Sequence, residues 1–491
     1  MKAATRPGAA AARLAETLRM AMQAHMNAEL DIAEPLYRRV LKLQPAHPDA
    51  LHYLGVLLHQ RGRGDEAVIL LGRALRLTPL HADAHCNLGN IHKEHARHAE
   101  AEACYRRALA LAPDHPQALG NLAIVLEALE RVDEAREAYQ AWLARMPADA
   151  RGHYQFGRFL CSHPRERADV EQAVEHFRGA FALDAGQLRV LEALGMALYG
   201  LERIEEAAAV YRDWAAREQD NPIPRHMLAA CGAAEAPARA GDDYVRELFD
   251  GFAASFDEQL VKNLGYRAPQ ALIDVLAPVL AMKHEGEREG EGEAAGLDIL
   301  DAGCGTGLCG PLLRAHAREL SGVDLSEGML DQARRRGGYD RLVNAELTAF
   351  LQAHPQSWDL IVSADTLVYF GALEALLAAA HAALRPGGHF AFSVETLPGE
   401  AAGHALSPSG RYRHGRAYLD AVLAGAGFVE VHVEAKALRR EAGRWVDGGV
   451  VRARRARGAG RRASRPRHRA HQERAPWRAA LPAVANFFPG R

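Results

Sequence analysis

The sequence has no apolar run approaching 18 residues, so it offers no segment long enough to cross a membrane as a helix. Its first 25 residues are rich in alanine and carry three arginines, but they lack the apolar core of a secretory signal. The six cysteines lie far apart and include no Cys-x-x-Cys pair, which argues against a zinc site or a disulfide framework. These absences predict a cytoplasmic protein without a bound metal or a membrane partner.

Charge is nearly balanced over the whole chain but unevenly distributed along it. The formal net charge of the 491 residues is −2, whereas residues 451–491 contain twelve arginines and one glutamate. This segment lacks helical periodicity and has few aromatic residues, so we predict a disordered basic tail. A shifted reading frame in a GC-rich gene would produce such a tail. The alternative is an arm that contacts nucleic acid nonspecifically through its phosphates; no other nucleic-acid partner is indicated.

Between residues 17 and 220 the chain repeats itself every 34 residues. Proline recurs with this step at Pro45, Pro79, Pro113 and Pro147. Small residues keep the same step at Gly55, Gly89, Ala123 and Gly157, and large apolar or aromatic residues at Tyr37, Leu71, Tyr105 and Tyr139. This period is that of tetratricopeptide (TPR) repeats, in which helix pairs stack because each pair alone leaves an apolar face bare. We expect about six pairs in an all-α superhelix.

The TPR resemblance implies a concave surface that recognises a protein or peptide partner. A spacer or an oligomerisation scaffold is the alternative, because the sequence does not identify a partner.

A second pattern begins at residue 297, where an apolar run ends in Asp301 and a glycine-rich turn. Gly303, Gly305 and Gly307 alternate with other residues, and apolar residues then return at helical spacing. Strand, tight loop and helix follow one another in this order where open parallel sheets bind nucleotides. A dinucleotide loop of the form Gly-x-Gly-x-x-Gly would need glycine at position 308, where Leu308 stands, so a nicotinamide dehydrogenase is disfavoured.

A second acid follows about 20 residues later. Residues 320–325 read as a short strand that ends near Asp324, and a carboxylate at this position can accept both hydroxyls of a ribose. The combination of Asp-x-Gly-x-Gly-x-Gly with this acid resembles the first motifs of class I S-adenosylmethionine (SAM) methyltransferases. SAM is cationic at its amine and its sulfonium, so an acid at the strand tip suits it electrostatically.

The resemblance implies a set of cofactor-binding residues. It places Asp324 at the ribose, Met329 near the adenine and Glu346 at the adenine amino group. Phe249-Asp250 and the segment Tyr266-Arg267-Ala268-Pro269 are similar to the stretch that covers the cofactor in a group of bacterial methyltransferases fused to TPR repeats. The whole cofactor set is Tyr266, Asp301, Gly303, Gly305, Gly307, Asp324, Leu325, Met329, Glu346, Leu347 and Ala364.

Methyl transfer from a sulfonium is an in-line displacement, so holding the two reactants in line supplies much of the acceleration. A general base is needed only where the acceptor must lose a proton. Asp365 follows the expected fourth strand, and Tyr369 would share its face if a helix began there. We therefore predict Asp365 and Tyr369 as catalytic residues that position the acceptor or remove its proton.

These patterns predict a multidomain chain, an all-α TPR superhelix followed by an α/β Rossmann-like class I methyltransferase domain. We expect a disordered N-terminus over 1–16, repeats over 17–220, a linker over 221–240, the methyltransferase domain over 241–450 and the tail beyond. The favoured function is methyl transfer to an acceptor that the repeats recruit. The alternative is an adaptor whose second domain binds SAM without turnover.

Overall fold

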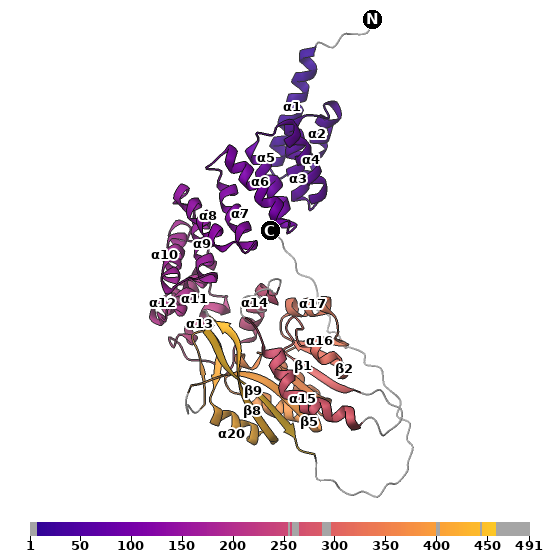
Figure 1. Cartoon of the computed structure of the whole chain (residues 1–491), viewed down its shortest axis with the longest axis vertical. Coiled ribbons are helices and arrows are strands. Elements are labelled where there is room, and N and C mark those ends of the chain that lie inside the picture. The colour runs from indigo at the N-terminus through magenta and orange to yellow at the C-terminus, as the bar shows by residue number, and fades with distance from the viewer. Residues whose placement is uncertain are drawn as a thin grey trace, which may run out of the picture.

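The computed structural model describes residues 7–253, 256–257, 265–286, 296–398, 403–441 and 444–457. Within these ranges, a row of paired helices leads into a nine-stranded sheet that carries helices on both faces (Figure 1). The all-α array followed by an α/β domain is therefore present. No helix in the described ranges combines the length and the apolar character that crossing a membrane requires.

The helical array consists of six pairs and a single last helix, counted over the described residues. Each pair is joined by a tight loop, and successive pairs stack side by side. The helices are α1 (Pro7–Met26), α2 (Leu30–Leu43), α3 (Pro48–Gln60), α4 (Gly64–Leu77), α5 (Ala82–Glu94), α6 (His98–Leu111), α7 (Pro116–Ala128), α8 (Val132–Arg145), α9 (Ala150–Ser162), α10 (Arg167–Leu183), α11 (Arg189–Gly200), α12 (Ile204–Arg217) and α13 (Pro222–Ala230).

The 34-residue spacing arises from contacts within each pair. A β-carbon at Gly89 in α5 would lie 2.7 Å from the ring of Tyr105 in α6, and one at Gly157 in α9 would lie 2.7 Å from the ring of Phe177 in α10. A small residue on the first helix therefore makes room for a large one on the second, as the sequence pattern predicts.

The helical array extends past both of the ends that the sequence suggested. Helix α1 begins at Pro7, within the segment expected to be disordered, and its Ala21 and Ala24 are buried in the same cluster as Ala33. Helix α13 occupies the expected linker, where the Asn221 side chain accepts a hydrogen bond from the Ile223 N–H at 2.9 Å. Both helices form because they cover an apolar end of the stack that would otherwise face water.

The sheet of the second domain has the order β3-β2-β1-β4-β5-β7-β6, with β9 antiparallel to β5 and β8 paired to β9. Neighbours among β1 to β5 are parallel, and the strand order reverses between β1 and β4. The strands are β1 (Leu297–Ala302), β2 (Ala317–Asp324), β3 (Arg341–Asn344), β4 (Trp358–Ser363), β5 (Leu384–Thr396), β6 (His404–Leu406), β7 (Tyr412–His414), β8 (Phe428–Glu441) and β9 (Arg444–Arg455).

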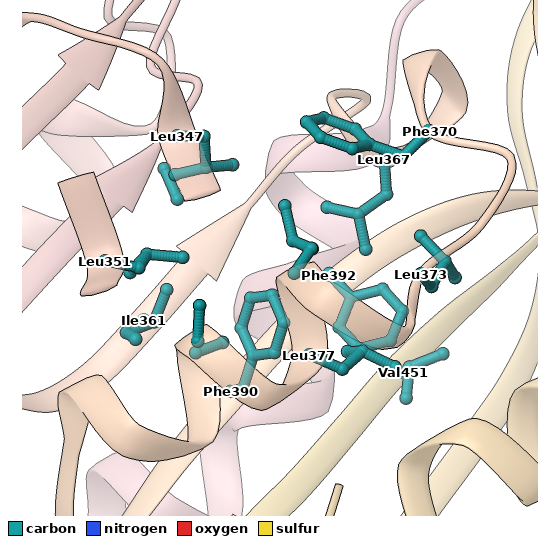
Figure 2. Packing of buried hydrophobic residues seen from close by; sticks show 14 of the residues in the cluster. Leu347, Leu351, Ile361, Leu367, Phe370, Leu373, Leu377, Phe390, Phe392 and Val451 are labelled. Atoms are coloured by element: carbon teal, nitrogen blue, oxygen red, sulfur yellow. The ribbon is translucent and has the colours of Figure 1, made fainter. Parts of the chain in front are cut away.

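Helices cover both faces of this sheet, because side chains of successive strand residues point to opposite faces. Leu297 and Ile299 pack on one side with residues of α15, and Leu300 packs on the other with α18, α19 and α20. Figure 2 shows part of this second cluster, where Phe390 and Phe392 meet leucines of the covering helices. The helices are α14 (Asp242–Phe252), α15 (Ala268–Gly286), α16 (Gly310–Arg314), α17 (Glu327–Arg336), α18 (Leu347–Ala353), the 3-10 helix η3 (Leu367–Tyr369), α19 (Glu374–Ala383) and α20 (Arg416–Gly425).

The last two strands form a hairpin that is longer than the sequence suggested. Strand β9 runs to Arg455, five residues into the segment expected to be a tail, and Val451 pairs with Phe392 of β5. Val451 and Ala453 are fully buried, which explains why the strand continues. The rest of the expected tail, from residue 458, lies outside the described residues.

Two glycines of α11 differ in the space available for a β-carbon, which allows a test of the packing inside the array. A β-carbon at Gly195 would overlap the ring of Tyr211, whereas one at Gly200 would meet nothing within 4 Å. We expect Gly195→Ala to destabilise the protein by roughly 1–3 kcal/mol through overpacking. Gly200→Ala should be neutral or slightly stabilising, because alanine favours helix. Thermal unfolding measured by calorimetry would test this, and equal effects of the two substitutions would contradict it.

Candidate functional site

A cavity lies at the carboxyl ends of β1, β2 and β4, where the strand order reverses. Open α/β sheets bind their ligands at this place. Twelve of the thirteen residues predicted as functional line the cavity. They are Tyr266, Asp301, Gly303, Gly305, Asp324, Leu325, Met329, Glu346, Leu347, Ala364, Asp365 and Tyr369.

Gly307, the thirteenth, does not line the cavity. All three glycines of the loop have positive φ, at 75°, 52° and 83° for Gly303, Gly305 and Gly307. A β-carbon at Gly303 would overlap Thr366, one at Gly305 would enter open space, and one at Gly307 would lie 3.0 Å from the ring of Tyr339. Gly307 therefore makes room for a tyrosine behind the loop, and its predicted contact with the cofactor stays a prediction.

Asp301 ends β1 with a buried carboxylate. Its Oδ2 accepts a hydrogen bond from the Tyr339 hydroxyl at 2.6 Å, and its Oδ1 is buried with no hydrogen-bond partner among the described residues. Burial, together with the nearby charge of Asp324, raises the pKa of Asp301 to about 7, although the Tyr339 hydroxyl opposes the shift. An unpaired buried acceptor of this kind is costly unless a ligand satisfies it.

Asp324 ends β2 and holds the glycine loop. Its Oδ2 accepts from the Gly305 N–H at 2.8 Å, and its Oδ1 accepts from the Ser326 N–H at 2.9 Å. Burial raises the pKa of Asp324, and the backbone donors lower it in part. The next helix, α17, is capped at its N-terminus, because the Ser326 hydroxyl accepts from the Met329 N–H at 3.1 Å. One carboxylate therefore links β2 to the loop that follows β1.

Glu346 lines the cavity but also caps a helix. Its Oε1 accepts from the Thr348 N–H at 3.0 Å and its Oε2 from the Ala349 N–H at 2.8 Å, at the start of α18. A carboxylate has about four acceptor sites, so two remain for a ligand. The capping orients the side chain, and its predicted contact with adenine stays a prediction.

Asp365 belongs to a buried ion cluster. Both of its oxygens accept from Nη1 of Arg439 at 3.0 Å, and Arg439 also pairs with Glu395 on β5. Arg439 and Glu395 are 1% and 0% exposed, and Asp365 itself has a left-handed φ of 58°. The Arg439 guanidinium fixes the position of the Asp365 carboxylate, and the catalytic role predicted for Asp365 stays a prediction.

Tyr369 does not share a helix face with Asp365. The only helix here is the short η3, which begins after Asp365, so the expected geometry was wrong among the described residues of this loop. The Tyr369 ring is buried and makes an edge contact with Phe249 of α14, with ring centroids 5.4 Å apart. Its aromatic edge still lines the cavity.

Helix α14 and Asp257 cover the start of α17 and the glycine loop. The carboxylate of Asp250 accepts from the Ser326 hydroxyl and from the Gly328 N–H, the latter at 3.1 Å. Asp257 accepts from the hydroxyl of Thr306. Each of these acids follows a phenylalanine that lines the cavity, Phe249 or Phe256, so the repeated Phe-Asp signal in the sequence corresponds to a cover over the loop.

Two arginines that sequence reasoning missed also line the cavity. Arg239 lies in the expected linker, and Arg411 lies in the turn between β6 and β7. Neither belongs to a motif, so the sequence contains no local signal for them.

Comparisons with known proteins agree with this geometry. Residues 299–388 match a family model described as "Methyltransferase domain", and residues 49–114 and 86–150 match models described as "Tetratricopeptide repeat". The chain is 40% identical over 95 residues to methyltransferase-like protein 27 of Homo sapiens, which covers 19% of this chain and 34% of that protein. It is 35% identical over 103 residues to a malonyl-[acyl-carrier protein] O-methyltransferase of Enterobacter lignolyticus. This match covers 20% of this chain and 41% of that protein.

Among solved structures, an S-adenosylmethionine-dependent methyltransferase from Mesorhizobium loti is 28% identical, with a TM-score of 0.26, covering 35% of this chain and 96% of that one. The chain spans less than half the length of the curated relatives it matches.

The raised pKa of Asp301 predicts a pH-dependent stability. Because its folded pKa of about 7 lies above the usual value near 3.9, the folded state gains stability from this group at acid pH and loses it as the pH rises toward 7. Asp301→Asn should therefore raise the unfolding temperature of the ligand-free protein more at pH 8 than at pH 5. The increases at the two pH values should differ by roughly 2–4 °C.

The control for this measurement is Asp274→Asn on the exposed face of α15. It should leave the pH profile unchanged, and an equal shift for Asp301→Asn at both pH values would refute the raised pKa.

Proposed function

We propose that this chain, a fusion of tetratricopeptide repeats to a class I methyltransferase domain, transfers a methyl group from SAM to an acceptor bound in the cavity. The observation that carries the proposal is the pair of carboxylates, Asp301 and Asp324, that face one cavity on either side of a loop with positive φ. The similarity to relatives covers only about 100 residues, so their acceptors are not carried over.

The residues around the cavity fit SAM in three respects. The unpaired Oδ1 of Asp301 suits a cationic group, because a buried carboxylate gains most from a charged partner. The carboxylate of Asp324 uses two acceptor sites on backbone N–H groups, which leaves two for the ribose hydroxyls. The bare Cα of Gly305 lets a ligand approach the backbone closely.

When bound, SAM would supply a methyl group on a sulfonium, whose thioether leaves without protonation. The chain then needs mainly to hold the acceptor in line and to keep water out. Phe249 and Phe256 form the apolar cover that excludes water, and Tyr266 lines the cavity beside Asp365. We assign to Asp365 the positioning of the acceptor, because Arg439 fixes its carboxylate. Tyr369 contributes the neighbouring wall.

A calorimetric titration with SAM tests the cofactor site. Asp324→Ala should weaken binding at least a hundredfold, because it removes the ribose acceptor and releases the Gly305 N–H. Asp331→Asn, on the exposed face of α17, is the matched control and should bind like the wild type. A wild-type chain that does not bind SAM would refute the proposal.

Transfer is measured separately, with SAM labelled in its methyl group. Binding without transfer to any protein or small molecule of a bacterial extract would favour the alternative function, an adaptor that holds SAM without turnover.

We further propose that the repeats recruit the partner or substrate through a polar ladder on the first helix of successive pairs. Asn121 of α7 donates to Asn90 of α5 at 2.8 Å, and its Oδ1 accepts from Lys93 at 3.1 Å and from Arg151 of α9 at 3.2 Å. Asn87 contacts His52 of α3 at 3.0 Å. These polar side chains link the first helices of four consecutive pairs, which supports binding of an extended peptide beside them.

A photo-crosslinking residue tests the ladder. Placed at Arg151, it should capture a partner protein from an extract, whereas the same residue at Arg107, exposed on the second helix of its pair, should not. Equal capture from both positions would contradict recognition by the ladder.

A further inference from the structure

The junction between the repeats and the second domain builds one wall of the cavity. The Ala240 N–H donates to the Tyr369 carbonyl at 2.8 Å, and the Gly371 N–H donates to the Ala238 carbonyl at 3.0 Å. Arg239 and Phe370 form a bridge between these two segments. The segment that leaves the array is thus fixed to the loop after β4, and the side chain of Arg239 lines the cavity.

The turn between β6 and β7 reaches the same wall. The Tyr412 hydroxyl donates to the carbonyl of Pro237, two residues before Arg239. On its other side the turn is held by α13, because Nε2 of His226 lies 2.9 Å from the Gly410 carbonyl oxygen. This support brings Arg411, the residue after Gly410, to the cavity.

One of the two arginines, Arg239, lies beside an aromatic ring. The Arg239 guanidinium donates to the carboxylate of Asp242 and lies over the ring of Phe370, 6.0 Å from its centroid. Arginine carries five N–H donors in a planar fork, so one carboxylate partner leaves donors for another ligand. Tyr369 and Phe249 make the adjoining surface apolar, which strengthens a charge-assisted hydrogen bond there.

We propose that Arg239 and Arg411 form a subsite that binds a carboxylate group of the methyl acceptor, at the wall of the cavity built by the junction with the repeats. This inference rests on the proposed function. Two guanidinium groups match the planar carboxylate geometry and repel a cationic acceptor such as an amine. Five acids line the same cavity, namely Asp242, Asp301, Asp324, Glu346 and Asp365, so a singly charged carboxylate is favoured over a doubly charged phosphate.

The position of the subsite agrees with this role. Asp324 and Met329 approach the cavity from the β2 side of the sheet, whereas Arg411 approaches from β7, beyond β4 and β5. A ligand that spans β1 at the switch point therefore has its nucleoside end on Asp324 and leaves the part of the wall that carries Arg411 for a second molecule.

The test is calorimetry on the full chain saturated with S-adenosylhomocysteine, the product form of the cofactor. The titrants are aliphatic mono- and dicarboxylates of two to ten carbons, their carboxamides, the matched amines and the matched phosphate monoesters. We expect carboxylates to bind at least tenfold tighter than the other three classes. Arg239→Gln and Arg411→Gln should each weaken carboxylate binding at least tenfold and leave the affinity for S-adenosylhomocysteine within twofold.

The matched control is Arg246→Gln on α14, an exposed arginine that pairs with Asp243 and does not line the cavity. It should bind like the wild type, and Arg411→Lys should recover part of the loss. Equal binding of carboxylates and carboxamides, tighter binding of phosphate esters or amines, or unchanged carboxylate affinity in both glutamine variants would overturn the inference. A chain that fails to bind S-adenosylhomocysteine refutes the proposed function itself, so the two failures are distinguishable.

Discussion

The cavity depends on one constraint, the pairing of the Asp324 carboxylate with backbone N–H groups on both of its sides. One oxygen holds Gly305 in the loop after β1, and the other holds Ser326 at the start of α17. The loop can take its positive φ values because this carboxylate compensates for N–H groups that no strand or helix pairs. Asp301 then remains as the buried acid whose second oxygen has no partner in the described structure. The loop and the two acids therefore form a single unit.

The location of Asp301, Asp324 and the glycine loop at one cavity could be predicted because its determinants are local. A strand, an acid and alternating glycines are close in sequence, and their spacing alone places them at one sheet edge. The limit of such reasoning is visible at Gly307. A glycine is needed there because the ring of Tyr339, 32 residues later in the chain, occupies the space beside it. The sequence shows the position of the glycine but not the atoms that pack against it.

The part of the cavity near Asp365, Arg239 and Arg411 could not be predicted in the same way. Asp365 was found by its place after a strand, but its partner Arg439 lies 74 residues later on β8. Arg411 lies between two strands of three residues each, which are too short to show an alternating pattern. Arg239 lies in a stretch whose composition indicates a linker, and only its pairing with residues 369–372 brings it to the cavity. Long-range contacts decide these positions.

The array and the catalytic domain are also mechanically joined. Helix α13 packs on α12 as the last element of the repeats, and the same helix buries His226 and Met227 against the turn that carries Arg411. The ring of His226 stacks on Tyr244 of α14 at 3.8 Å between centroids, so the cover of the cavity rests on the array as well. A shift of α13 would therefore act on the turn that carries Arg411 and on the cover of the cavity, and through Asp250 of α14 it would also reach Ser326 beside Asp324.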